Sequence, residues 1–313
     1  MRRVRAFAPG TVANLGPGLD ILGLAVAGAG DTVTAERSAS REIRIRSSGH
    51  PEIPGEPEKN TAGIAALRVR AMASADSIGM TLEIEKGLPL SGGQGGSAAS
   101  AVAAAVAVNE LLGCPLSRER LLEPCLDAEA AVSGRHADNV AAALFGGVVL
   151  IRSADPIDVV RLSYPEELRV VVVAPHQSLR TEEARKRLPR SVALPVALAQ
   201  AASVGALVAA LAIRDFDLLR RSIEDRIAEP SRAPLLPGFV EAKRAALEAG
   251  ALGCSISGSG PTAFALARGR ERAERVAAAM VASHAAGGRR AESVVGAVDR
   301  RGARLTGDGS EES

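Results

Sequence analysis

Glycine, serine and alanine gather in residues 89–100 (PLSGGQGGSAAS), and this composition suits a phosphate-binding loop. The preceding segment, Thr81–Lys86, alternates apolar and polar residues, which is typical of a half-buried strand. An Ala-rich helix is expected over Ser97–Leu112, with Gly113 placed to end it. Glycines let several backbone N–H groups approach a ligand, and a helix N-terminus carries partial positive charge and free N–H donors. The segment therefore predicts a phosphate site.

Two familiar glycine motifs match the same segment less well. A Walker A loop needs Gly-Lys-Ser or Gly-Lys-Thr, which the segment lacks. Gly93–Ala98 (GQGGSA) fits the GxGxxA pattern of dinucleotide-binding folds, but its glycines lie well past the end of the strand, and no strand ending in Asp or Glu follows at the usual distance. Considered alone, the segment is explained equally well as a flexible glycine loop without a ligand.

Other polar residues that could bind a substrate lie far from this loop in the sequence. Asn14 and Asp20 stand among glycines, where such residues commonly bond to their own backbone. His136, Asp138 and Asn139 form a dense polar cluster between a helix and a buried strand, and a helix-end or turn cluster is the alternative interpretation, above all for Asp138.

Guanidinium and hydroxyl groups add further candidates. Arg185 and Arg232 could each clamp a carboxylate through two parallel hydrogen bonds, although a single arginine is most often a solvated surface residue. Ser97 could cap the helix, bind a phosphate oxygen or ligate magnesium, which prefers oxygen ligands.

The elements that must position these residues are short strands mixed with helices. Strands are predicted over Glu42–Arg46, Thr81–Lys86, Gly147–Ile151, Val170–Ala174, Cys254–Ser257, Thr262–Ala267 and Val294–Val298. Helices are predicted over Ser97–Leu112, Ser117–Val132, Leu194–Ile213, Phe216–Ala228, Pro237–Ala249 and Arg270–Ala285. Pro124 is expected to divide the second helix, since an interior proline costs about 3 kcal/mol or forces a kink. The absence of strict βαβ alternation predicts an α+β fold.

Composition excludes several classes of protein. Aromatic residues make up only 2% of the chain and the net charge is +2 without a basic run, so we expect no nucleic-acid partner. The three cysteines lack zinc-site spacing, and the N-terminal MRRVRAFAPG has no apolar stretch of a signal peptide. The longest apolar run is placed around Ser100–Val108, too short to span a bilayer. These features predict a cytoplasmic protein without a membrane partner.

Three motifs in order along the chain resemble those of the GHMP kinases. They are residues 8–25 (APGTVANLGPGLDILGLA), the glycine loop, and residues 250–266 (GALGCSISGSGPTAFAL). Within that superfamily, residues 134–147 (GRHADNVAAALFGG), 181–185 (TEEAR) and 229–239 (EPSRAPLLPGF) resemble motifs of the homoserine kinase family. The resemblance implies a two-domain α+β fold: a ribosomal-S5-domain-2-like domain over residues 1–158 and a ferredoxin-like domain over residues 159–305. Residues 306–313 are expected to form a polar tail.

The resemblance also implies a reaction and its residues. ATP would phosphorylate the side-chain hydroxyl of L-homoserine, with Mg²⁺, on the route to threonine. The catalytic residues implied are Asn139, Thr181, Ser97 and Glu129, and the last two would ligate the metal. The substrate would contact Asn14, Asp20, His136, Asn139, Arg185 and Arg232. ATP would contact Asn60, Lys86, Pro89, Leu90, Ser91, Gly92, Gly93, Gln94, Gly95, Gly96, Ser97, Ala98, Ala99 and Ser100.

The chain departs from the family pattern at several positions. Gly96 and Gln94 stand where most relatives have a serine and an apolar residue, and one residue is missing near Arg135, which leaves Asp127 as the alternative to Glu129. The departures keep two other hypotheses open: a GHMP kinase for another alcohol such as threonine, and a catalytically silent relative that binds nucleotide or amino acid. The sequence is also compatible with a homodimer.

Overall fold

The N-terminal domain is built on a mixed sheet that contains two long strands not predicted from the sequence. The computed structural model describes residues 2–90, 92–132 and 134–307. The sheet runs β11 (Arg304–Leu305), β1 (Arg3–Ala13), β2 (Leu22–Arg37), β4 (Met80–Glu85) and β3 (Ile43–Ser47), and β5 (Val148–Ala154) pairs with β2 and with β6 (Ile157–Leu162). All pairs are antiparallel except β3 with β4.

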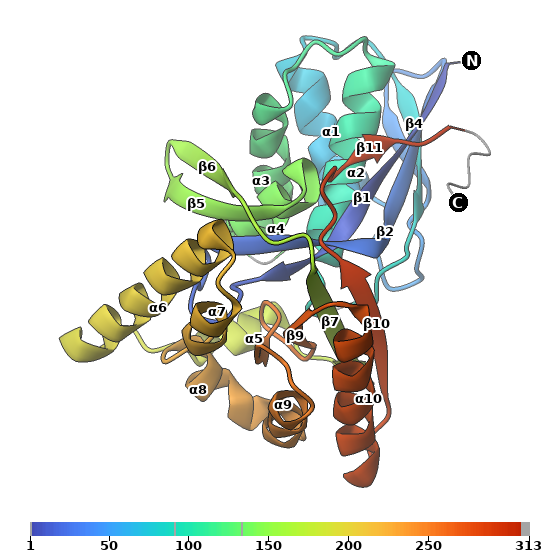
Figure 1. Cartoon of the computed structure of the whole chain (residues 1–313). Helices are drawn as coiled ribbons and strands as arrows, with labels where there is room; N and C mark the ends of the chain where they lie inside the picture. Colours follow the sequence, from blue (N-terminus) through green and yellow to red (C-terminus); the bar gives the residue numbers. More distant parts are fainter. Residues whose placement is uncertain (1, 91, 133, 308–313) are drawn as a thin grey trace.

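Four helices pack together on this sheet (Figure 1). They are α1 (Thr61–Met72), α2 (Gly96–Leu111), α3 (Leu122–Ala130) and α4 (Ala137–Phe145), with short 3-10 turns at Pro57–Lys59 and Glu119–Leu121. The helix α2 is buried on almost every side, and ten of its sixteen residues are alanine or valine. Small side chains let its neighbours approach closely, so the aromatic-poor composition still yields a dense core.

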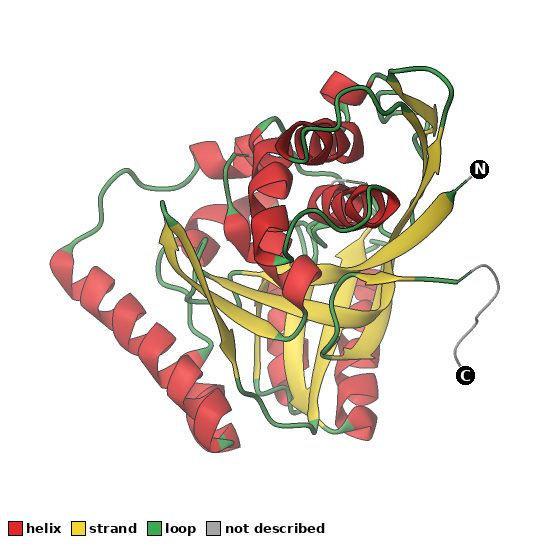
Figure 2. Cartoon of the chain, turned by 90° about the horizontal axis from the view of Figure 1, so that it is seen from above, coloured by secondary structure: helices red, strands yellow, loops and turns green. Residues whose placement is uncertain are grey.

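The C-terminal domain has a four-stranded antiparallel sheet in the order β10 (Ala291–Ala297), β7 (Leu168–Pro175), β9 (Ala263–Arg268) and β8 (Gly253–Ile256). The helices α9 (Phe239–Glu248) and α10 (Arg270–Ala286) cover one face. The other face shares a core with the N-terminal sheet and with α6 (Leu194–Ile213) and α7 (Phe216–Ser222). The short helices α5 (Thr181–Lys186) and α8 (Ala228–Arg232) and a 3-10 turn (Ala233–Leu235) complete the domain, and Figure 2 shows the layers from above.

The α+β class and the two-domain architecture are confirmed, with local corrections. The expected change of domain after residue 158 stays a prediction; it falls inside β6, which pairs with β5, and β11 also pairs with the N-terminal sheet. The single helix predicted over 216–228 is wrong, because α7 ends at Ser222 and α8 begins at Ala228. The expected division of a helix at Pro124 is wrong: the 3-10 turn ends at Leu121, and Pro124 lies in the first turn of α3, where it removes no helical hydrogen bond.

The placement of the longest apolar run around Ser100–Val108 is also wrong. Helix α6 has 20 residues, and by length and apolar composition alone it could cross a membrane. One such helix among the described residues is weak evidence for a membrane span. Gln200 also fastens α6 to the protein body through the Pro17 carbonyl and the Asp225 carboxylate.

Candidate active site

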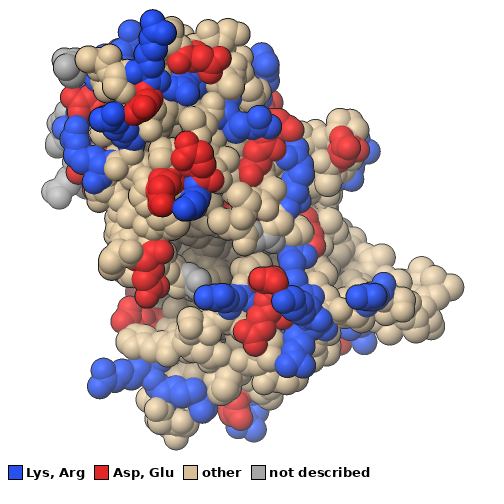
Figure 3. Space-filling model, turned by 180° about the vertical axis from the view of Figure 1, so that it is seen from behind, with Lys and Arg blue, Asp and Glu red and all other residues tan. Residues whose placement is uncertain are grey.

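A cavity of about 540 Å³ opens between the two domains and collects most of the predicted site residues. Figure 3 shows the molecule hollowed on this face, with acidic and basic side chains standing around the hollow. We call the part lined by residues 89–97 the phosphate end. The part lined by Asn14, Asp20, His136, Asp138, Arg185 and Arg232 is the substrate end.

The phosphate end is a turn forced by glycines at the start of α2. Gly93 and Gly95 have φ values of +72° and +69°, a region that side chains disfavour, and Gly95 is the residue that caps α2. The Ser257 hydroxyl donates to the Gly93 carbonyl at 2.6 Å, so the loop after β8 clamps the glycine loop from the other domain. The first N–H groups of a helix have no partner within it, and such groups at the start of α2 suit an anion.

Not every predicted ATP residue lines the cavity. Those that do are Asn60, Lys86, Pro89, Leu90, Gly92, Gly93, Gly95, Gly96, Ser97 and Ser100. Ala98 and Ala99 are fully buried in the core, and Gln94 borders a separate small pocket, where its carbonyl accepts from the Thr11 N–H at 3.0 Å. Their side chains are therefore not ATP contacts in this geometry. Ser91 lies outside the described residues.

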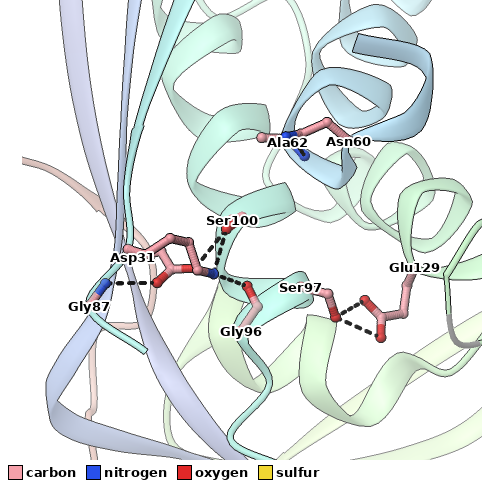
Figure 4. A network of polar contacts seen from close by, with 9 residues as sticks. Asp31, Asn60, Ala62, Gly87, Gly96, Ser97, Ser100 and Glu129 are labelled. Carbon is pink, nitrogen blue, oxygen red and sulfur yellow. Dashed lines mark hydrogen bonds and ion pairs between the residues drawn. The ribbon is translucent and has the colours of Figure 1, made fainter. Parts of the chain in front are cut away.

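Lys86 is fixed by a buried network that the sequence did not reveal (Figure 4). Its ammonium pairs with Asp31, which is fully buried, and donates to the Gly96 carbonyl and the Ser100 hydroxyl at 3.0 Å each. Ser100 donates to the same carboxylate at 2.6 Å, and the Gly87 N–H donates to it at 3.1 Å. The network ties the first turn of α2 to β2 and β4, so it holds the phosphate end rigid.

Asn60, the other residue predicted beside the adenine, is committed to the backbone. It caps α1, its side-chain oxygen accepting from the Ala62 N–H at 2.9 Å and the Gly63 N–H at 3.4 Å. Its amide nitrogen donates to the Pro54 carbonyl at 2.9 Å. Asn60 therefore forms part of the cavity wall, with its side-chain amide bonded to the backbone.

Ser97 and Glu129 form an oxygen pair suited to a metal ion. The Ser97 hydroxyl lies 3.1 and 2.8 Å from the two carboxylate oxygens of Glu129, which is buried and lines the cavity. The alternative carboxylate, Asp127, pairs instead with Arg68 and Arg135 outside the cavity. One carboxylate and one hydroxyl fit Mg²⁺, which binds oxygen and keeps several waters. Among the described residues no cluster of three or more His, Cys, Asp or Glu side chains offers another metal site.

The substrate end is held together by Asp20. Its carboxylate accepts from Arg185 at 3.1 and 2.6 Å in a two-pronged pair, and His136 Nδ1 lies 3.7 Å away. Asn14 joins the same loop to the other domain, accepting from the Asp20 N–H at 3.1 Å and donating to the Gly258 carbonyl at 3.0 Å. Both Asn14 and Asp20 have positive φ, so the loop is bent to present these side chains.

Arg232 closes the substrate end from the C-terminal domain. It is 2% exposed, and its Nη1 donates to the Gly258 carbonyl at 2.7 Å. The Nε atoms of Arg232 and Arg185 are buried and lack a hydrogen-bond partner among the described residues. Buried guanidinium donors without a partner are costly, so a carboxylate from a bound molecule is a fitting acceptor.

The titratable groups of this end have shifted pKa values. Burial would raise the pKa of Asp20, but the hydrogen bonds and charge of Arg185, with smaller effects of His136 and Arg232, outweigh it and lower that pKa below its ordinary value. Burial lowers the pKa of His136 despite the nearby Asp20. Burial, followed by the Asp20 charge, raises the pKa of Asp138 to about 7. Burial therefore favours the neutral form of the Asp138 carboxyl over the charged form.

Asn139 lies at the junction of the two ends, and Thr11 orients it. The Thr11 hydroxyl donates to the Asn139 side-chain oxygen at 2.6 Å. The amide nitrogen of Asn139 therefore points away from Thr11. Thr11 was not among the predicted site residues, although it lies in the N-terminal motif. Thr181, at the start of α5, lies 3.2 Å from the Ser259 hydroxyl and also lines the cavity.

Comparison with known proteins now adds to this geometry. Residues 60–147 match the family model of the GHMP kinases N terminal domain, and residues 207–286 that of the GHMP kinases C terminal. The chain is 45% identical to homoserine kinase of Chlorobium phaeobacteroides over 90% of this chain and 91% of the relative. It is 43% identical to that of Arabidopsis thaliana, over 89% of this chain and 77% of the relative.

This chain belongs to the homoserine kinase family of GHMP kinases. A crystal structure of homoserine kinase from Cytophaga hutchinsonii agrees with it at a TM-score of 0.94 and 42% identity, covering 98% of both chains. The departures from the family pattern have mild structural consequences. Gln94 lies away from the cavity. A Cβ at Gly96 would stand 3.3 Å from the Lys86 ammonium, so the missing side chain faces that network rather than the oxygen pair of Ser97 and Glu129.

Proposed function

We propose that the protein transfers the γ-phosphoryl group of ATP to the side-chain hydroxyl of L-homoserine, forming O-phospho-L-homoserine. One observation carries the proposal: a single cavity joins a glycine loop at a helix N-terminus to a cluster of one acid and two arginines. Such a cluster suits a molecule that brings its own positive and negative charge, as an α-amino acid does. The relatives named homoserine kinase support this substrate.

The positions of the charged side chains determine how the amino acid would be oriented in the cavity. Arg232 and Arg185 hold the carboxylate, since a guanidinium presents two parallel donors to it. Asp20 and Asn14 receive the ammonium, which replaces part of the Asp20–Arg185 pairing. His136 and Asn139 then face the rest of the substrate, with Asn139 nearest the phosphate end.

The phosphate end supplies electrostatic stabilisation rather than a nucleophile. N–H donors of the glycine loop and α2 hold the phosphates, and Thr181 borders the region of the γ-phosphate. Ser97 and Glu129 would hold Mg²⁺, which offsets phosphate charge when bound. The hydroxyl oxygen bonds to the γ-phosphorus as the bond between that phosphorus and the β,γ-bridging oxygen breaks and ADP leaves. The hydroxyl proton passes to an oxygen of the γ-phosphoryl group, and alignment of the reacting atoms contributes most of the rate. No residue is assigned as general base.

The test is ADP release measured with the purified full-length chain, Mg²⁺ and a panel of L-homoserine, L-threonine and L-serine. Turnover at least ten times more efficient with homoserine is the expected result. Preference for threonine would favour the second hypothesis, a kinase of another alcohol. Tight ATP binding without ADP release from any alcohol would favour the silent relative. We place the protein in the cytoplasm, and we place its product, O-phospho-L-homoserine, on the route to threonine.

A further inference from the structure

Arg232 reaches the substrate end of the cavity from a very short helix. It is the last residue of α8, which has five residues, and its guanidinium donates to the Gly258 carbonyl at 2.7 Å. A helix this short has little stability of its own, because forming its first turn costs more than its few hydrogen bonds return. The position of the Arg232 guanidinium therefore depends on the contacts that hold α8 in place.

The carboxylate of Asp225 fixes the start of α8. One of its oxygens accepts from the N–H groups of Ile227 and Ala228 at 2.9 Å each, and the other accepts from the Glu229 N–H at 2.8 Å. Asp225 is buried and is not among the residues that line the cavity. Burying a charge is costly unless its hydrogen bonds are satisfied, and here backbone donors of a single turn satisfy them. Asp225 therefore orients the turn that carries Arg232.

Gln200, on α6, connects this turn to the loop that carries Asp20. Its side-chain nitrogen donates to the Asp225 carboxylate at 3.0 Å and to the Pro17 carbonyl in that loop at 2.7 Å. Its side-chain oxygen accepts from the Arg226 N–H at 2.8 Å. Gln200 is buried and, like Asp225, does not line the cavity. A single amide therefore joins the two segments that supply the acid and one of the arginines of the substrate end.

The charge of Asp225 also acts on Arg232. Burial, followed by the charge of Arg185, lowers the pKa of Arg232 below its ordinary value. The charges of Asp20 and Asp225 act on that pKa in the opposite direction. Asp20 is already engaged by Arg185 in a two-pronged pair, whereas Asp225 makes its hydrogen bonds to the backbone and to Gln200. Asp225 thus favours the charged guanidinium of Arg232 without occupying its donors.

We infer, on the basis of the proposed function, that Asp225 and Gln200 are positioning residues that act through Arg232 on the carboxylate of the amino-acid substrate. Asp225 fixes the helix that carries Arg232, and Gln200 fixes the start of that helix relative to the loop of Asp20. The ammonium and the carboxylate of an α-amino acid are attached to the same carbon, so the distance between them is nearly constant. The spacing of their partners, which selects such a molecule, is therefore set by two side chains outside the cavity.

Steady-state ADP release by the full-length chain tests the role of Asp225. Asp225→Asn keeps the size of the side chain but replaces one accepting oxygen by a donor. The KM for L-homoserine should rise at least about 10-fold, as expected for the loss of a hydrogen bond to a charged group. The kcat and the KM for ATP should change little, because binding of the carboxylate contributes equally to the ground state and the transition state. A merely structural role would lower kcat, through loss of active enzyme, and leave both KM values unchanged.

A matched aspartate controls for the loss of a helix cap. Asp215 accepts from the Asp217 and Leu218 N–H groups at the start of the neighbouring α7, and it lines a different hollow of the surface. It uses a single oxygen, so asparagine can replace it. Asp215→Asn should therefore have the KM values of the wild type. A rise of the homoserine KM equal to that of Asp225→Asn would overturn the inference.

A double variant tests whether Asp225 acts through Arg232. Residues that act as one unit have non-additive effects. Adding Asp225→Asn to Arg232→Ala should therefore raise the homoserine KM no further than Arg232→Ala does alone. Independent, multiplying increases would show that Asp225 does not act through Arg232 and would overturn the inference.

Gln200→Glu keeps the inference testable if Asp225→Asn does not fold. The glutamate has the same length, but its oxygen would face the Pro17 carbonyl and the Asp225 carboxylate, to which the amide donates. The homoserine KM should rise about 10-fold, with the KM for ATP unchanged. An unchanged homoserine KM in either folded variant would overturn the inference and leave the proposed function standing. A wild type that releases no ADP with homoserine would overturn the proposed function, and the inference with it.

Discussion

At the phosphate end of the cavity the binding groups are backbone N–H donors, whereas at the substrate end they are charged side chains brought from both domains. The first depends on two glycine conformations and a helix start, which lie within a dozen residues of one another. The second joins Asp20 to Arg185, which is 165 positions away in the sequence. The phosphate end should therefore tolerate few backbone changes, and the substrate end should respond to charge and pH.

The largest expected effect is a pH dependence of the free energy of unfolding that arises at the substrate end. Because burial raises the Asp138 pKa to about 7, the folded chain retains a proton that the unfolded chain, with a pKa of 3.8, has lost. The free energy of unfolding should fall as pH rises from about 4 to about 7. The fall is at most about 4 kcal/mol for three pH units.

Asp138→Asn should abolish this dependence, so that the variant gains stability relative to the wild type as pH rises. Urea unfolding at pH 5, 6, 7 and 8 measures it. Asp127→Asn is the control, since that carboxylate lies outside the cavity with Arg68 and Arg135. Parallel curves for wild type and Asp138→Asn would contradict the prediction.

A single methyl group should disable the phosphate end. A Cβ at Gly95 would stand 2.0 Å from the Thr11 hydroxyl and 2.9 Å from the Asn139 side-chain oxygen. We expect Gly95→Ala to lower kcat/KM by more than about 100-fold, as displacements of about 1 Å in a site can do. Gly113→Ala is matched to it, because Gly113 also has positive φ but open space around it. Equal losses in the two variants would show that backbone strain, not the site, is responsible.

Arg232→Ala should weaken the amino acid and spare the nucleotide. Removing one partner of a buried charge pair costs about 2–5 kcal/mol, so we expect the KM for homoserine to rise about 100-fold. The KM for ATP should stay within about 2-fold, because Arg232 lies at the substrate end. Arg226→Ala removes an exposed guanidinium that pairs with Glu224 and should change neither constant. A comparable loss of ATP affinity would refute the separation of the two ends.

Glu129→Gln should raise the Mg²⁺ concentration for half-maximal activity by about 30-fold, within the range for altered metal-site partners. The amide is similar in shape and can still accept from Ser97, so the variant removes charge rather than packing. Asp127→Asn should leave this concentration unchanged. If the two variants exchanged roles, Asp127 would be the metal ligand. Titration of ADP release with Mg²⁺ provides the measurement.

The smallest expected effect concerns the orientation of Asn139 at the junction of the two ends. Thr11→Val removes one hydrogen bond, which contributes about 0.5–1.5 kcal/mol, so kcat should fall about 5-fold. Thr34→Val is the control, because the buried Thr34 hydroxyl has no hydrogen-bond partner among the described residues. An unchanged kcat for Thr11→Val would show that Asn139 is oriented without Thr11.

Local patterns in the sequence were sufficient for the glycine loop, the helix that follows it, and α6 and α10 within one residue at each end. These elements depend on residues close together in the chain. The strands β1 and β2 were missed, because Ala- and Gly-rich motifs obscure the alternation of apolar and polar residues along them. The two strands are stabilised by pairing with each other, which the sequence pattern does not show. Helices α1 and α4 were missed as well, since more than half of the buried residues on each are alanine, which gives a weak apolar pattern.

The sequence by itself determined the family, the α+β class and the candidate residues, because motifs and composition are properties of the chain. Only the tertiary structure decided which candidates meet. It placed Glu129 rather than Asp127 beside Ser97, engaged Lys86 with the buried Asp31, and added Thr11 behind Asn139. It also revealed that the apolar α6 is exposed. Burial and charge pairing act between residues distant in sequence, so no local pattern encodes them.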